Sequence, residues 1–146
     1  MHLRLLKFLT IVSLSIVCIA CANIKFAVQD EDSAAKQFNV ANGESNIYVY
    51  RNVGVIIDTA VSIEIDGKSA GNTDHKTFIL KSVSPGNHTI SAHAENTDTI
   101  DLTTEPGGNY FVWLEVRTGA VTNHAHLHSV GEEKGKKGVM ESRLVE

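Results

Sequence analysis

Three histidines spaced two residues apart are the side chains of this sequence best suited to bind a metal ion. They are His124, His126 and His128 in the segment NHAHLHS. On a β-strand this spacing places the three imidazoles on one face, about 6.6 Å apart, and imidazole nitrogens are good ligands for Zn²⁺ or Cu²⁺. The outer two would lie roughly 13 Å apart, so only a bulge would gather all three around one ion. A solvated strand face opposite Ala125 and Leu127 is the alternative, and we favour it.

Both cysteines of the 146-residue chain lie in one apolar stretch, SIVCIAC, at Cys18 and Cys21. This stretch follows MHLRLLK, which carries two basic residues, and an uncharged, mostly apolar run over residues 8–20. That order is typical of an export signal with a small-residue cleavage site. As a helix the run would extend about 20 Å, which is too short to cross a hydrocarbon core of roughly 30 Å comfortably. We therefore predict that residues 1–20 are a removed signal peptide.

The residues CIAC resemble the lipobox of bacterial lipoproteins, in which the cysteine after a small residue is lipidated and becomes the first mature residue. The resemblance implies that Cys18 leaves with the signal and that Cys21 carries the fatty acids, palmitate among them, so neither a disulfide nor a thiolate metal site remains. Cys18 stands where the family usually has Leu, and plain secretion is the alternative. Acyl chains gain about 0.8 kcal/mol per buried methylene, so several of them anchor a protein almost irreversibly. Ala22 after the anchor resembles the outer-membrane sorting choice, with the domain facing the periplasm.

The charge balance limits the partners of the chain. Lys and Arg number 13 against 17 Asp and Glu, for a formal net charge of −4, and removal of the signal would take away Arg4 and Lys7. An acidic protein is poorly suited to nucleic acid or anionic lipid as its main partner. We expect two partners instead, the lipid bilayer through acylated Cys21 and an envelope protein that the sequence does not identify.

The rest of the chain is predicted to divide into a tether over residues 21–45 and a β-rich domain over residues 46–146. In the tether, Asp32 or Ser33 can cap one or two helical turns that reach Phe38. In the domain, apolar and polar residues alternate with the period of two that half-buried strands have. Turn sequences DG, SPGN and PGG separate these runs. The pattern predicts a single antiparallel β-sandwich of about seven strands, transthyretin-like or immunoglobulin-like.

Two further predictions concern particular segments of the domain. The basic segment Glu132–Gly138 is predicted to be a loop, followed by a last strand or one helical turn over Val139–Glu146. In the PGNH corner, His88 is predicted to bond the turn backbone at the start of a strand.

The strand expected near Tyr110 is apolar on both faces. Phe111 and Trp113 alternate along it with Val112 and Leu114. Such a strand is either central and covered on both sides, by Phe38 or the chain end, or it exposes Phe111 and Trp113 as an aromatic patch for a partner. We favour the covered arrangement.

Four segments together point to a family. They are NIYVYRNVG, VSIEIDGKSAG, SPGNHTISAHAEN and PGGNYFVWLEVRTG, beginning at Asn46, Val61, Ser84 and Pro106. In order and spacing they resemble the small proteobacterial lipoproteins classed as domain of unknown function 2846. The part from Asp66 to Ile90 is also similar to PEGA and transthyretin-like modules, which are β-sandwiches used for adhesion or display. The resemblance implies no catalytic residues.

The remaining polar residues offer no catalytic set. The outward carboxylates are not paired by spacing for acid–base chemistry, and no G-x-S-x-G, phosphate-binding glycine loop or H-E-x-x-H occurs. We therefore predict a lipid-anchored, non-enzymatic envelope module with an interaction or structural role and no cofactor. The alternative is a periplasmic protein that binds Zn or Cu through His124, His126 and His128.

Overall fold

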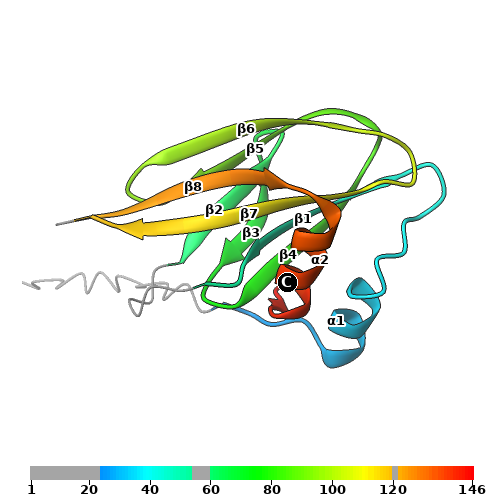
Figure 1. Ribbon diagram of the computed structural model, residues 1–146, viewed down its shortest axis with the longest axis horizontal. Coiled ribbons are helices and arrows are strands. Elements are labelled where there is room, and N and C mark those ends of the chain that lie inside the picture. Colours follow the sequence, from blue (N-terminus) through cyan, green and yellow to red (C-terminus); the bar gives the residue numbers. More distant parts are fainter. Residues whose placement is uncertain (1–23, 54–59, 120–121) are drawn as a thin grey trace, which may run out of the picture.

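The computed structural model describes residues 24–53, 60–119 and 122–146, so the predicted signal peptide and Cys21 lie outside the described residues. These residues form two sheets and two helices (Figure 1). Their order along the chain is α1 (Gln29–Ala35), β1 (Ser45–Arg51), β2 (Val61–Ile65), β3 (Lys68–Thr73), β4 (Thr77–Val83), β5 (Gly86–His93), β6 (Thr97–Thr104), β7 (Asn109–Thr118), β8 (Asn123–Val130), α2 (Glu132–Met140) and β9 (Arg143–Leu144). Neither helix in this part of the chain has the length and apolar character needed to cross a membrane.

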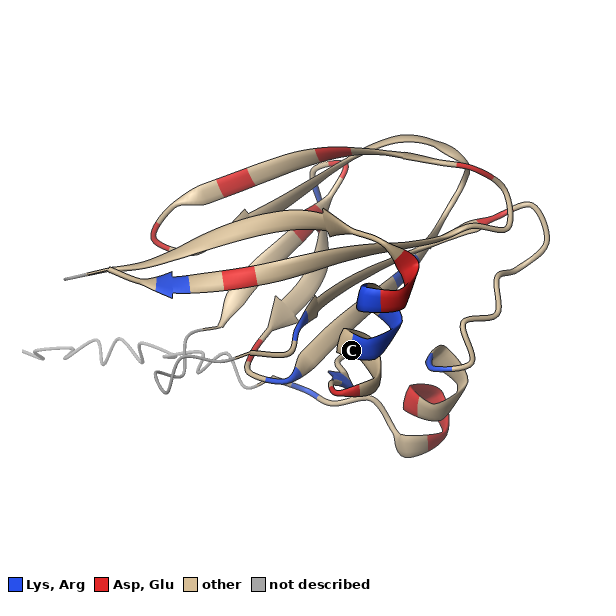
Figure 2. Cartoon of the chain, viewed as in Figure 1, with Lys and Arg blue, Asp and Glu red and all other residues tan. Residues whose placement is uncertain are grey.

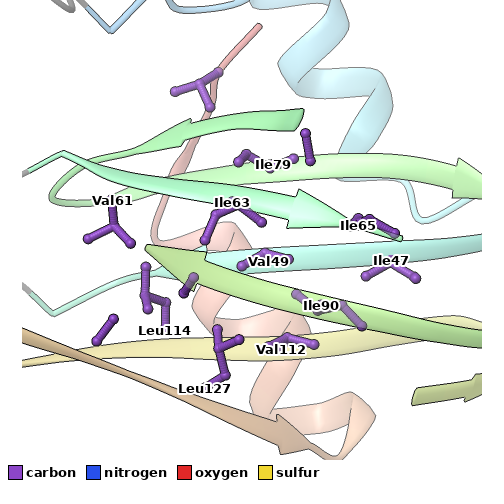
Figure 3. Close-up of a cluster of buried hydrophobic side chains, with 14 residues drawn as sticks. Ile47, Val49, Val61, Ile63, Ile65, Ile79, Ile90, Val112, Leu114 and Leu127 are labelled. Atoms are coloured by element: carbon purple, nitrogen blue, oxygen red, sulfur yellow. The ribbon is translucent and has the colours of Figure 1, made fainter. Parts of the chain in front are cut away.

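The molecule has three layers, with both helices on one face of a five-stranded sheet and a four-stranded sheet on the other (Figure 1). The five-stranded sheet has the order β8-β7-β1-β4-β9, and the four-stranded sheet has the order β3-β2-β5-β6. Strand β1 is buried along its whole length because both faces of its sheet are covered. Ile47 and Val49 enter the core between the sheets, whose side chains Figure 3 displays. Tyr48 and Tyr50 enter a second core beneath the helices, and burial raises the pKa of both tyrosines to about 12.

The sequence alternation is confirmed in the four-stranded sheet. Strand β2 buries Val61, Ile63 and Ile65 and leaves the residues between them partly exposed. Asp66 and Gly67 form the turn to β3, with φ angles of 53° and 70°. Two successive positive φ angles are the signature of the tight hairpin turn that Asp-Gly favours, so the predicted turn is present.

The β-rich architecture is confirmed, but the five-stranded sheet is mixed rather than antiparallel, and the prediction of about seven strands was too low. Strand β1 pairs in parallel with β7, and β4 pairs in parallel with β9. The described residues contain nine strands, because β3 and the short β9 add to those predicted. Parallel pairing joins strands that are far apart in the sequence, and local alternation carries no information about it.

The segment Glu132–Gly138 belongs to helix α2, so the prediction of a loop was wrong. Gly135 and Gly138 lie on the buried face of α2 and let the helix approach the sheet closely. A Cβ atom on Gly135 would lie 2.1 Å from Cγ of Phe111, and one on Gly138 would lie 2.0 Å from Cε2 of Tyr50. Glycine disfavours a helix by about 1 kcal/mol relative to alanine, so this helix depends on docking rather than on propensity.

Residues 24–44, placed in the tether by the sequence prediction, are packed on the sandwich. Phe26 forms an antiparallel bridge with Val145. The Ala27 N–H donates to the Leu144 carbonyl at 3.1 Å, and the Glu146 N–H donates to the Lys25 carbonyl at 2.9 Å. Residues 25–27 therefore continue the edge of the five-stranded sheet beyond β9.

Helix α1 begins at Gln29, a few residues before the predicted caps. Its acidic residue Asp32 does not cap the helix; its Oδ1 accepts a hydrogen bond from the Leu144 N–H at 2.7 Å. The predicted docking of Phe38 is confirmed, since its ring lies 5.4 Å from the ring of Tyr48 and 5.9 Å from that of Phe111. The Tyr48 hydroxyl also donates to a carbonyl at the end of α1.

Side chains from β6 and the turn before it bond the backbone of the edge strand β8. The Asn96 Oδ1 accepts from the Ala125 N–H at 2.7 Å, and its Nδ2 donates to the Ala125 carbonyl at 2.9 Å. The Asp98 Oδ2 accepts from the Leu127 N–H at 2.7 Å. These bonds join the two sheets along one side. They also provide hydrogen-bond partners for backbone groups of β8 that point away from β7.

Candidate functional site

The three histidines lie on one face of strand β8, as their spacing predicts. The strand buries Ala125 and Leu127 on its other face and leaves His124, His126 and His128 exposed or partly exposed. Each histidine stands opposite a residue of β7: His124 opposite Arg117, His126 opposite Glu115 and His128 opposite Trp113. The histidine face therefore continues across β7 as a row of charged and aromatic side chains.

The contacts on this face are ion pairs and stacking. Glu115 Oε2 lies 2.9 Å from an Arg117 nitrogen and 3.0 Å from His128 Nε2. The hydrogen bond from Arg117 and, to a smaller extent, that from His128 hold the pKa of Glu115 below its ordinary value. The His124 Nε2 is within hydrogen-bond distance of the Thr122 hydroxyl. Among the described residues, no three His, Cys, Asp or Glu side chains are grouped so that they could hold a metal ion.

The aromatic pair Phe111 and Trp113 is covered by the helices and by Phe38, the arrangement that the sequence analysis favoured. Phe111 is 2% exposed, so its assignment to an exposed interaction patch is wrong. Trp113 is partly buried, stacks on His128 with ring centroids 5.1 Å apart, and lies under the Lys134 ammonium of α2 at 4.5 Å. These side chains bind the helix layer to the sheet.

A hollow of about 480 Å³ opens between the two sheets beside β3 and β4. Two lysines, Lys68 and Lys81, line it together with the ion pair of His88 and Asp66. Three serines border it as well, and its apolar wall is formed by Ile65, Ala70 and Val83. Of its four chargeable side chains, Lys68, Lys81 and His88 are basic and Asp66 is acidic.

Both ring nitrogens of His88 are engaged in hydrogen bonds. Nδ1 lies 2.7 Å from Asp66 Oδ2, and Nε2 lies 2.9 Å from the Ser84 carbonyl oxygen. A carboxylate and a carbonyl only accept hydrogen bonds, so this geometry favours the imidazolium form, in which both nitrogens donate. Burial lowers the pKa of His88, but these two hydrogen bonds outweigh burial and raise the pKa above its ordinary value. The bonds from His88 and from the Thr89 N–H lower the pKa of Asp66.

The His88–Asp66 pair fastens the β2–β3 turn to the start of β5. The Asp66 N–H donates to the Thr89 carbonyl, and the Thr89 N–H donates to Asp66 Oδ1, both at 2.9 Å. The predicted bond of His88 to the turn backbone is confirmed. Its partner Asp66 was missed because the pairing of β2 with β5 brings the two together, and only the Asp-Gly turn signal marked that position.

A family model and one relative match this chain. A model of the family described as "Protein of unknown function (DUF2846)" matches residues 41–127, which include β1 to β7 and the first part of β8. The chain is also 32% identical over 133 residues to an uncharacterized protein of Haemophilus influenzae, with 89% of this chain and 79% of that protein covered. The chain therefore belongs to the DUF2846 family.

Proposed function

We propose that the mature protein is a lipid-anchored module of the cell envelope, held on the periplasmic side of the outer membrane by acylated Cys21. The observation that carries this proposal is the order of basic, apolar and small residues that ends at Cys21. The packed part of the chain supports it, because contacts with the sandwich begin only a few residues later, at Ile24 and Phe26. A domain that starts directly after the anchor needs no further segment for attachment.

The proposed role is binding or structural support rather than catalysis. The support comes from His88, which lines the hollow beside β3 and β4. Both of its ring nitrogens are engaged by Asp66 and Ser84, and in the protonated form that these two acceptors favour the ring has no lone pair with which to act as a general base. An envelope protein contacting the exposed strand faces is the proposed partner.

The anchor is tested on protein expressed from the 146-residue sequence and isolated from membranes. Mass spectrometry of the amino-terminal peptide is expected to find diacylglyceryl and acyl groups on a chain that begins at Cys21. A Cys21→Ser variant is expected to lose both the lipid and membrane fractionation. A free Cys21 thiol on a chain that retains residues 1–20 would refute the anchor.

The non-catalytic role has its own test. Lipidated protein bound to envelope fractions is cross-linked, and a specific partner that competes with soluble domain supports a binding module. Turnover of an envelope substrate by purified protein, abolished by one side-chain change such as His88→Gln, would refute it.

A further inference from the structure

One edge of the molecule combines exposed apolar and basic side chains next to the start of the described chain. We call it the anchor-proximal edge and define it by Lys25, Phe26, Val28 and Arg143. Phe26 is 42% exposed and Val28 is 61% exposed, although both are large apolar residues. Ala27 between them is buried, so the extended segment turns Phe26 and Val28 outward together.

Backbone hydrogen bonds fix this edge to the sandwich. Ala27 donates to the Leu144 carbonyl, and the Lys25 carbonyl accepts from the Glu146 N–H. The segment therefore moves with the five-stranded sheet and is not a free tether. Its side chains have a defined orientation relative to the whole domain.

The length of chain before this edge limits how far it can lie from Cys21. Ile24 follows Cys21 by three residues, and an extended chain spans at most about 3.5 Å per residue. Ile24 therefore lies within about 10 Å of an anchor at Cys21. That distance is comparable with the depth of a headgroup region, since headgroups add roughly 5–8 Å to each side of the hydrocarbon core.

The side chains on the edge have the chemistry of a membrane interface. The Arg143 guanidinium lies 4.3 Å from the centroid of the Phe26 ring. Aromatic rings and long basic side chains are both favoured at the headgroup level, where the ring is partly desolvated and the cation reaches phosphate. Lys25 pairs with Glu146 beside them, and Asp30 and Glu31 follow in α1, so the edge has no strong net charge.

We propose that the anchor-proximal edge lies on the bilayer surface, with Phe26 and Val28 in the headgroup region, and that this contact sets the orientation of the domain. The inference rests on the proposed acylation of Cys21. The mixed charge of the edge suits zwitterionic headgroups rather than a strongly anionic surface. Strand β6, with Asp98 and Asp101, then lies on the opposite side of the molecule and faces away from the membrane (Figure 2).

The orientation is tested with a tryptophan reporter in the lipidated protein. The natural Trp113 is replaced by Phe, since it is the only tryptophan in the sequence, and tryptophan is introduced by Phe26→Trp or, in a second variant, Val28→Trp. The matched control is Thr99→Trp, at an exposed position of β6. Each protein is placed in phosphatidylcholine vesicles that contain brominated phosphatidylcholine as quencher.

We expect a blue-shifted emission and strong quenching for tryptophan at position 26 or 28, and neither for tryptophan at position 99. Water-like, unquenched emission from 26 and 28, in protein whose mass confirms the lipid on Cys21, would overturn the inference and leave the anchor intact. A mass without lipid would instead refute the proposed function. The same quenching measurement after coupling of Cys21 to a maleimide lipid would then decide the orientation by itself.

Discussion

Replacing Gly138 with alanine tests whether helix α2 is held by close contact with the sheet or by its own helical tendency. On propensity alone, alanine would stabilise the helix by about 1 kcal/mol. In the structure, however, the new Cβ would lie 2.0 Å from Cε2 of Tyr50, whereas carbon atoms in contact are about 3.5–4.0 Å apart. The helix and ring must therefore separate by about 1.5 Å.

The ring cannot simply move aside, because Tyr50 is 1% exposed. Overpacking of this kind costs about 1–3 kcal/mol, against a gain in propensity of about 1 kcal/mol. We therefore expect Gly138→Ala, and likewise Gly135→Ala against Phe111, to lower the free energy of unfolding by up to about 2 kcal/mol.

Urea unfolding followed by circular dichroism measures this change, and the fluorescence of Trp113 reports it locally, because Lys134 of α2 lies over its ring. The matched control is Gly131→Ala at the start of α2, where a Cβ would meet nothing within 4 Å. We expect that control to change stability by less than about 1 kcal/mol. An increase in stability for Gly138→Ala would show that propensity dominates and would refute the docking argument.

Three further predictions address other contacts. The stability difference between wild type and His88→Gln should be largest between about pH 4 and 6.5 and should fall as pH rises through the raised pKa of His88. The reason is that the pair needs an imidazolium and an ionised Asp66, and urea unfolding across pH checks it. Tyr48→Phe should cost about 1 kcal/mol in thermal or urea unfolding, because the Ala35 carbonyl loses the 2.9 Å bond from the Tyr48 hydroxyl and keeps the 3.2 Å bond from the Phe38 N–H. Asn96→Ala should lower stability by about 1–3 kcal/mol and promote self-association in size-exclusion chromatography, because backbone groups of β8 lose their partner; an unchanged, monomeric variant would contradict this.

The sequence predicted the β-rich fold well where one face of a strand is exposed to solvent. The alternation Val61, Ile63 and Ile65 and the Asp-Gly turn after it correspond directly to β2 and its hairpin. Such patterns are visible because burial alternates with exposure in the same order as the residues. The covering of Phe111 was also predictable, because a strand apolar on both faces needs material on both sides.

Helix α2 and the parallel pairs were not predictable by the same means. The residues that make α2 possible, Gly135 and Gly138, favour a loop when only neighbours in the sequence are considered. Their role in close packing is evident only when Phe111 and Tyr50 are placed beneath them. Among the candidate site residues, Asp66 and His88 are 22 positions apart, and strand pairing alone brings them together.

The bonds from Asn96 and Asp98 to the backbone of β8 have a consequence for the membrane-anchored form of the protein that we propose. Molecules fixed to one surface meet often and in similar orientations, which would favour strand-by-strand polymerisation through any open β-edge. In the outer strand β8, the outward N–H groups of Ala125 and Leu127 already donate to the side chains of Asn96 and Asp98. At the opposite margin, residues 25–27 run along the short β9. The backbone groups bonded at these two margins of the five-stranded sheet are therefore not available to pair with a strand of another molecule.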